Sequence, residues 1–105
     1  MFPIRRFARQ LEEILSELDG LAESLDGETG EDLEDLNAEL EDALMLLSEV
    51  KEEGEDWREE FADAMEEIQA LAEDYGGLAP DIPEISSLAE RLHMSVEMAL
   101  NSLKA

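Results

Sequence analysis

The residues best suited to chemistry in this chain are its single histidine, His93, and the glutamate three positions before it, Glu90. Residues three apart project from the same side of a helix, and carboxylate-bridged di-metal bundles use this Glu-x-x-His spacing. Those centres need the motif on two helices and acids from two more, so one histidine supplies half of the set at most. A symmetric dimer could supply the other half across its interface, but the apolar stripes of the helices contain no inward acids. We therefore expect no metal and no cofactor, with Glu90 and His93 as weak candidates and His93 at the edge of the core.

Acidic residues offer a second kind of chemistry because they gather in short runs. Two runs are the densest: Glu31, Asp32, Glu34 and Asp35 in one, and Glu52, Glu53, Glu55 and Asp56 in the other. Neither run matches an EF-hand loop, which needs alternating oxygen ligands, a central glycine and a distal glutamate. Carboxylate catalysis needs a sheltered pocket, whereas these acids occupy outward positions of a helical pattern. We predict that these eight residues make electrostatic contacts with a partner.

Other catalytic arrangements have no counterpart in the sequence. The chain has no cysteine, and no Gly-x-Ser-x-Gly turn is present to activate a serine. No strand precedes a glycine-rich segment, so we do not expect a phosphate-binding loop. The sequence predicts a protein that is not an enzyme.

Net charge divides the chain into three parts. The 30 acidic and seven basic residues give −23 at pH 7. Residues 1–11 carry +3, residues 12–81 carry −25, and residues 82–105 carry −1. A field of this size repels nucleic acid and anionic membranes and attracts basic partners. We therefore expect a basic protein partner, with no direct binding of nucleic acid or membrane.

Apolar residues spaced three and four apart predict helices along nearly the whole chain. The first stripe runs over 4–25, the segment 26–30 interrupts it, and a second stripe runs over 33–50. Leu44 and Leu46 flank the second stripe on both sides, which predicts a broad apolar face.

Polar residues, prolines and glycines mark the helix ends. Thr29 and Asp32 resemble a capping box for the second helix. The stretch 75–80 contains two glycines and a proline and is predicted to end a further helix. The last helix is predicted to start near residue 82, with Pro83 in its first turn, and to run almost to residue 105.

The segment 51–56 leaves two architectures open. Gly54 can end one helix and Asp56 can begin the next, which produces a helical hairpin. The heptad spacing nevertheless continues through Gly54, and one helix over 31–75 would be about 67 Å long. Such a rod is too long for a compact monomer and would require a partner, most simply a second copy. The hairpin is the favoured alternative.

The predicted fold class is therefore all-α. We expect an antiparallel helical bundle with four helices, or with three if a long central helix dimerises. A single domain over 1–105 suits this length, which is enough for one modest core. No run of 18 apolar residues exists, and the first residues lack the apolar core of a secretory signal, so we expect a cytoplasmic protein.

The last helix carries an apolar surface in addition to its stripe. Met94 and Met98 lie one helical turn apart, among small polar residues and few charges. Methionine side chains adapt to varied partner shapes. We predict that Met94, Met98 and Leu100 contact a partner or a second copy in a homodimer.

Three functions of different classes account for the acidity. The favoured one is a non-enzymatic interaction module of the adaptor, inhibitor or chaperone type, which binds a basic protein through a carboxylate-rich face. The second is a nucleic-acid mimic that occupies a cationic groove made for phosphates. The third is a structural helical oligomer whose acidity serves only solubility or adaptation to salt.

Overall fold

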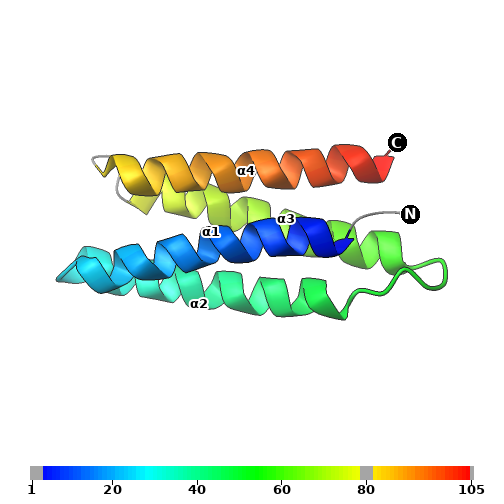
Figure 1. Ribbon diagram of the computed structural model, residues 1–105, viewed down its shortest axis with the longest axis horizontal. Helices are drawn as coiled ribbons and strands as arrows, with labels where there is room; N and C mark the ends of the chain where they lie inside the picture. The colour runs from blue at the N-terminus through cyan, green and yellow to red at the C-terminus, as the bar shows by residue number, and fades with distance from the viewer. Residues whose placement is uncertain (1–3, 79–81, 105) are drawn as a thin grey trace.

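The computed structural model describes residues 4–78 and 82–104. This part of the chain forms four α-helices: α1 (Ile4–Ser24), α2 (Glu28–Glu49), α3 (Trp57–Leu78) and α4 (Pro83–Lys104). The helices run alternately in opposite directions, so the start of α1 and the end of α4 lie at the same end of the molecule (Figure 1). The prediction of an all-α antiparallel bundle is confirmed in its four-helix form.

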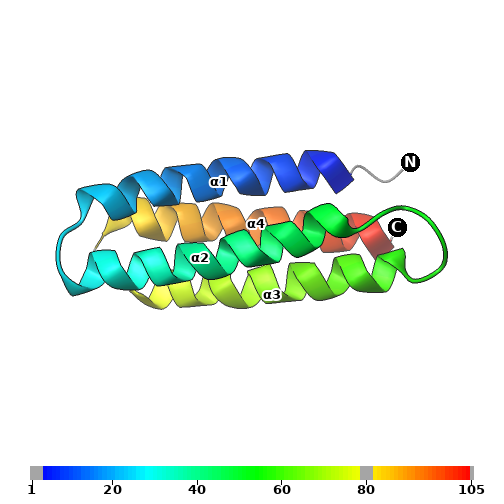
Figure 2. The same cartoon turned by 90° about the horizontal axis from the view of Figure 1, so that it is seen from below.

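Each helix packs against two neighbours. The contacting pairs are α1 with α2, α2 with α3, α3 with α4, and α4 with α1. The four helices therefore occupy the corners of a square, with α2 diagonally opposite α4, and form a rod of 46 × 21 × 18 Å (Figure 2). Because only the side facing the two neighbours is covered, the rest of every helix remains available to solvent or to partners.

The hairpin between α2 and α3 resolves the ambiguity around Gly54. Helix α2 ends at Glu49, where Val50 adopts an extended conformation and its N–H bonds to the carbonyl of Leu47. Residues 51–56 are all exposed. The backbone of Gly54 has a φ of 83°, which residues other than glycine rarely adopt. The single long helix was the wrong alternative, because the chain instead folds back and buries the apolar faces of α2 and α3 together.

A single apolar cluster joins all four helices. Its fully buried members come from every helix, and the largest are Leu11, Leu18, Leu33, Leu40, Leu47, Phe61, Met65, Ile68, Tyr75, Ile85, Leu92 and Val96. In α1 the buried stripe shifts from Leu18 to Ala22, while Leu21 and Leu25 are only partly buried. A straight helix drifts about 20° per heptad relative to a strict seven-residue repeat, so the buried face moves to the neighbouring residue.

The broad apolar face predicted for α2 is narrower in the structure. Leu44 is buried, but the Leu46 side of the helix is not covered, and Leu46 is 51% exposed. The prediction that both leucines widen the core-facing side was wrong for Leu46. The square arrangement is the reason, since α2 has neighbours on two sides only.

The turn between α1 and α2 is tighter than predicted. Helix α2 starts at Glu28 after Gly27, and no side chain caps its first turn, so the predicted Thr29 capping box is wrong. Gly30 lies inside the helix and is buried against the backbone of Leu25. The start at Glu28 places Glu28 and Glu31 in the first turn, where carboxylates interact favourably with the helix dipole.

The end of α3 and the start of α4 agree with the sequence prediction. Helix α3 passes through two exposed glycines to Leu78, which packs against the core within the stretch predicted to end the helix. Helix α4 starts at Pro83, as predicted. No helix in the described ranges is apolar over a length sufficient to cross a membrane.

One polar pair lies inside the core. The Tyr75 hydroxyl of α3 donates a 2.8 Å hydrogen bond to Oδ1 of Asn37 in α2, and Asn37 is only 4% exposed. The Asn37 Nδ2 is buried without a hydrogen-bond partner. Burial raises the pKa of Tyr75 above its ordinary value of 10.0, and the charges of Asp19 and Glu39 raise it further. The pair ties one position of α2 to one position of α3, which disfavours a shifted alignment of the two helices.

We predict that Tyr75→Phe lowers the free energy of unfolding at neutral pH by about 1–3 kcal/mol, because it leaves a buried amide with no partner. The double variant Asn37→Leu with Tyr75→Phe should recover most of this loss, since two apolar groups then replace both partners. Urea denaturation measures both values. A double variant less stable than Tyr75→Phe would show that the pair is net stabilising.

The same tyrosine produces a pH dependence in alkali. The phenol ionises above pH 10.0 in the unfolded chain but stays neutral in the fold, so its contribution to stability is complete below pH 10.0 and is lost as the pH rises beyond it. Tyr75→Phe should therefore lose less stability than the wild type between pH 9 and 11. Parallel slopes for the two proteins would contradict the buried neutral phenol.

Two glycines in helices are predicted to respond in opposite directions to alanine. A Cβ at the exposed Gly20 meets no atom, so Gly20→Ala should raise stability by about 1 kcal/mol. A Cβ at Gly30 would clash with the Leu25 carbonyl oxygen, so Gly30→Ala should lower stability by about 1–3 kcal/mol despite the better helix former. Thermal or urea denaturation of the two variants compares them directly.

Candidate functional site

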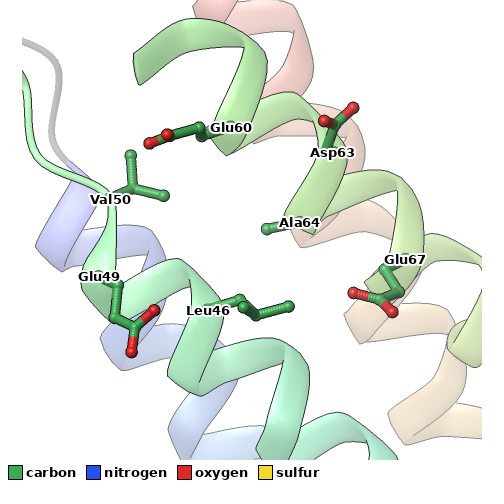
Figure 3. Close-up of a pocket in the computed structure, with 7 residues that line it drawn as sticks. All are labelled: Leu46, Glu49, Val50, Glu60, Asp63, Ala64 and Glu67. Atoms are coloured by element: carbon green, nitrogen blue, oxygen red, sulfur yellow. The ribbon is translucent and has the colours of Figure 1, made fainter. Parts of the chain in front are cut away.

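A groove between α2 and α3 is the strongest candidate site in the described structure. It has a volume of about 390 Å³ and lies near the end of the bundle where residues 50–56 connect α2 to α3. Its apolar lining comes from Leu46 and Val50 of the α2 side and Ala64 of α3 (Figure 3). A leucine that is 51% exposed at the centre of a groove is apolar surface that the fold itself leaves uncovered.

Four carboxylates surround this apolar lining. Glu49 belongs to α2, and Glu60, Asp63 and Glu67 follow one another along α3. In Figure 3 the Glu60 and Glu67 side chains extend from α3 toward α2 at the two ends of the groove. All four residues are exposed, and none forms an ion pair within residues 4–78 and 82–104. The groove therefore combines an apolar centre with a rim of unpaired negative charge.

A second groove, between α1 and α4, differs in its charges. It has a volume of about 570 Å³ and includes Leu21, Leu88 and the space left by Gly20. Its Arg91 lies 2.8 Å from Glu17 in an ion pair that joins α4 to α1. Because a cation of the chain already pairs with one of its acids, this groove carries a weaker negative charge than the groove between α2 and α3.

The two acidic runs lie at opposite ends of α2. The first run, Glu31 to Asp35, belongs to the first two turns of α2. The second run, Glu52 to Asp56, forms the exposed loop that follows directly on the groove residues Glu49 and Val50. About 21 Å of helix separates Asp35 from Glu49 at 1.5 Å per residue. The structure therefore brings the second run next to the groove and leaves the first run away from it.

The three α4 residues predicted to form an apolar contact differ in their exposure. Met94 and Met98 are 57% and 61% exposed, whereas Leu100 is partly buried and packs against the core. The two methionines point away from the bundle, because the buried residues of α4 occupy the opposite side of the helix. The exposed apolar surface on α4 therefore consists mainly of Met94 and Met98, and Leu100 contributes little to it.

His93 pairs with Glu97 and not with Glu90, the acid of the Glu-x-x-His motif. Its Nε2 lies 3.0 Å from Glu97, one turn later, and the ring is at the edge of the core. In the described ranges no three histidine, cysteine or acidic residues come together in a way that could hold a metal ion. Glu90 is exposed and joins no such group.

Sequence reasoning missed the residues of the groove. Glu49, Asp63 and Glu67 stand outside the densest acidic runs, so density alone did not select them. Leu46 was assigned to the core-facing side. One signal was available: Leu46 directly precedes Leu47, which belongs to the stripe, and two adjacent large apolar residues cannot both lie on one narrow helical stripe.

Comparison with known proteins adds no assignment to this geometry. No protein-family model, no curated protein and no solved structure matches the chain.

Proposed function

We propose that this chain is a non-enzymatic, acidic interaction module of the adaptor, inhibitor or chaperone type that binds a basic protein. The observation that carries the proposal is the groove between α2 and α3, where an exposed leucine lies among four unpaired carboxylates. An apolar centre with a charged rim is the usual anatomy of a protein-binding surface. The negative rim selects for a partner with lysine or arginine beside its apolar residues.

The groove favours this function over the two alternatives. A nucleic-acid mimic needs carboxylates arranged like phosphates, and an exposed leucine at the centre contributes nothing to that likeness. Acidity that serves only solubility does not require an apolar groove at all. Both alternatives explain the charge, but only a protein partner makes use of the charge and of Leu46 together.

The acidic runs have distinct places in this proposal. The loop acids Glu52, Glu53, Glu55 and Asp56 continue the rim beyond Glu49 and contact the end of a bound partner. The acids Glu31 to Asp35 lie farther along α2 and act through the long-range field that accelerates encounter. The same field is expected to repel nucleic acid and anionic membranes.

The proposal predicts that binding depends on where charges are removed as well as on how many. The test variant replaces Glu49, Glu60, Asp63 and Glu67 by Gln or Asn, and the control variant replaces Glu12, Glu13, Glu23 and Asp26 in the same way. The probe is a fluorescent peptide of about 18 residues made of lysine and leucine. The test variant should bind about tenfold or more weakly than wild type, since it loses four rim contacts, and the control within about threefold.

Fluorescence anisotropy at 50 mM and 500 mM NaCl measures both effects. We expect the wild-type affinity to fall strongly at the higher salt concentration, because screening shortens the range of the rim charges. Equal loss in the two variants would mean that only the total charge matters. No measurable binding by the wild type at 50 mM NaCl would contradict the proposal.

We also propose that α4 joins two copies of this chain. The bundle closes its own core, so a dimer is not needed for folding, but Met94 and Met98 remain exposed. Two copies that each carry −23 repel one another, and α4 belongs to the segment with a net charge of only −1. A contact through α4 keeps the strongly charged helices apart and leaves both α2 and α3 accessible.

Light scattering after size-exclusion chromatography tests this second proposal. The wild type is expected to have the mass of a dimer, and Met94→Glu with Met98→Glu that of a monomer, because four added charges would face one another across the contact. Circular dichroism should stay unchanged, since both side chains are outside the core. A wild-type mass of about 11.8 kDa at high protein concentration would overturn it.

A further inference from the structure

We infer that the partner enters the groove as a basic amphipathic helix, which lies along α2 and α3 with apolar side chains on Leu46 and cationic ones toward the rim. This inference rests on the proposed function and identifies the conformation and chemistry of the segment that is bound. It follows from the shape of the groove, from the spacing of its rim and from the lack of any ion pair on the four rim carboxylates within residues 4–78 and 82–104.

The walls of the groove are two antiparallel helices, so the groove is itself a helix-packing surface. Side chains of a third helix fit into the gap between two adjacent helices as ridges fit into grooves. Leu46 and Ala64 project into this gap from opposite sides (Figure 3). Ala64 is only 4% exposed and its small side chain leaves space beside Leu46, so a large apolar side chain of the bound helix would contact mainly Leu46.

The rim residues of α3 have the periodicity of a helix. Glu60, Asp63 and Glu67 are separated by three and four residues, which places them along one side of α3 over about 10 Å. Lysine or arginine residues spaced three and four apart on a bound helix have the same rise. Each can therefore face one carboxylate while the apolar side of the bound helix faces Leu46.

An extended segment matches this surface less well. A strand is recognised by pairing its backbone with an exposed sheet edge, and residues 4–78 and 82–104 contain helices and turns but no strand. If an extended segment lay in the groove, its backbone N–H and C=O groups would face the side chains of α2 and α3 and find no regular hydrogen-bond partners. A helix satisfies those groups internally, so only its side chains need to match the groove.

The cations of this chain near the groove leave the rim available. Arg58 lies over the ring of Trp57, with its guanidinium carbon 5.4 Å from the ring centre. Lys51 is exposed in the loop and forms no ion pair within the described ranges. Four carboxylates around about 390 Å³ therefore attract cations from outside the chain.

Three peptides of identical composition test the inference. The first places leucine on one face of a helix and lysine or arginine on the others, and the second scrambles that order. The third keeps the first half but, in the second half, exchanges the leucines with basic residues of the opposite face, so that the apolar stripe changes sides halfway along the peptide. Anisotropy and circular dichroism follow binding and helix formation. We expect the first peptide to bind at least tenfold more tightly than the other two and to gain helicity when bound.

A pair of adjacent residues provides matched variants. Leu46→Ser removes the exposed apolar side chain from the groove, and Met45→Ser removes one that is 59% exposed but does not line the groove. Both variants should fold, because neither side chain is buried. Leu46→Ser should weaken binding of the amphipathic peptide by about five- to fiftyfold and Met45→Ser by less than twofold.

The outcomes separate this inference from the function on which it rests. If all three peptides bind equally and salt abolishes the binding, the chain binds basic partners but does not select a helix, and the inference is overturned. Equal losses from Leu46→Ser and Met45→Ser would overturn it as well, since the apolar contact would lie elsewhere. If none of the peptides binds at low salt, the proposed function fails together with the inference.

Discussion

The structure depends on the burial of four apolar helix faces against the mutual repulsion of 30 acidic residues. The core members alternate along each helix at three- and four-residue intervals, so apolar burial falls on one side and the acids fall on the other. High net charge by itself favours expansion. The rod-like bundle satisfies both demands, because its shape spreads the carboxylates over a long surface while one continuous core joins the helices.

The groove is a consequence of the same arrangement. In a square bundle each helix covers only part of its neighbours, so an apolar residue just beyond the covered side remains exposed, as Leu46 does. The acids of the adjacent α3 are placed around it because they occupy the outer positions of their own helix. A binding surface for a basic, partly apolar segment thus arises from ordinary helix packing. No buried catalytic or metal-binding cluster is needed to produce it.

Polar specificity inside the core complements the apolar packing. Leucine-rich faces tolerate several alignments of neighbouring helices, whereas the hydrogen bond from Tyr75 to Asn37 is made in only one. Because α2 and α3 also form the walls of the groove, this pair favours, together with the apolar core, one alignment of Glu49 and Leu46 with Glu60 and Glu67. The buried pair therefore acts on the candidate site through the positions of the helices.

The sequence alone determined the helical class, the approximate segments and the outward placement of the acids, because these depend on local periodicity and on Gly and Pro near helix ends. The sequence left open whether Gly54 ends a helix, because the heptad spacing continues through this residue. It also assigned Leu46 to the core-facing side of its helix. Only the tertiary structure decided these points: which helices are neighbours determines which apolar residues are covered. Residues distant in sequence, such as Glu49 and Glu67, form one rim only because α2 and α3 fold back on each other.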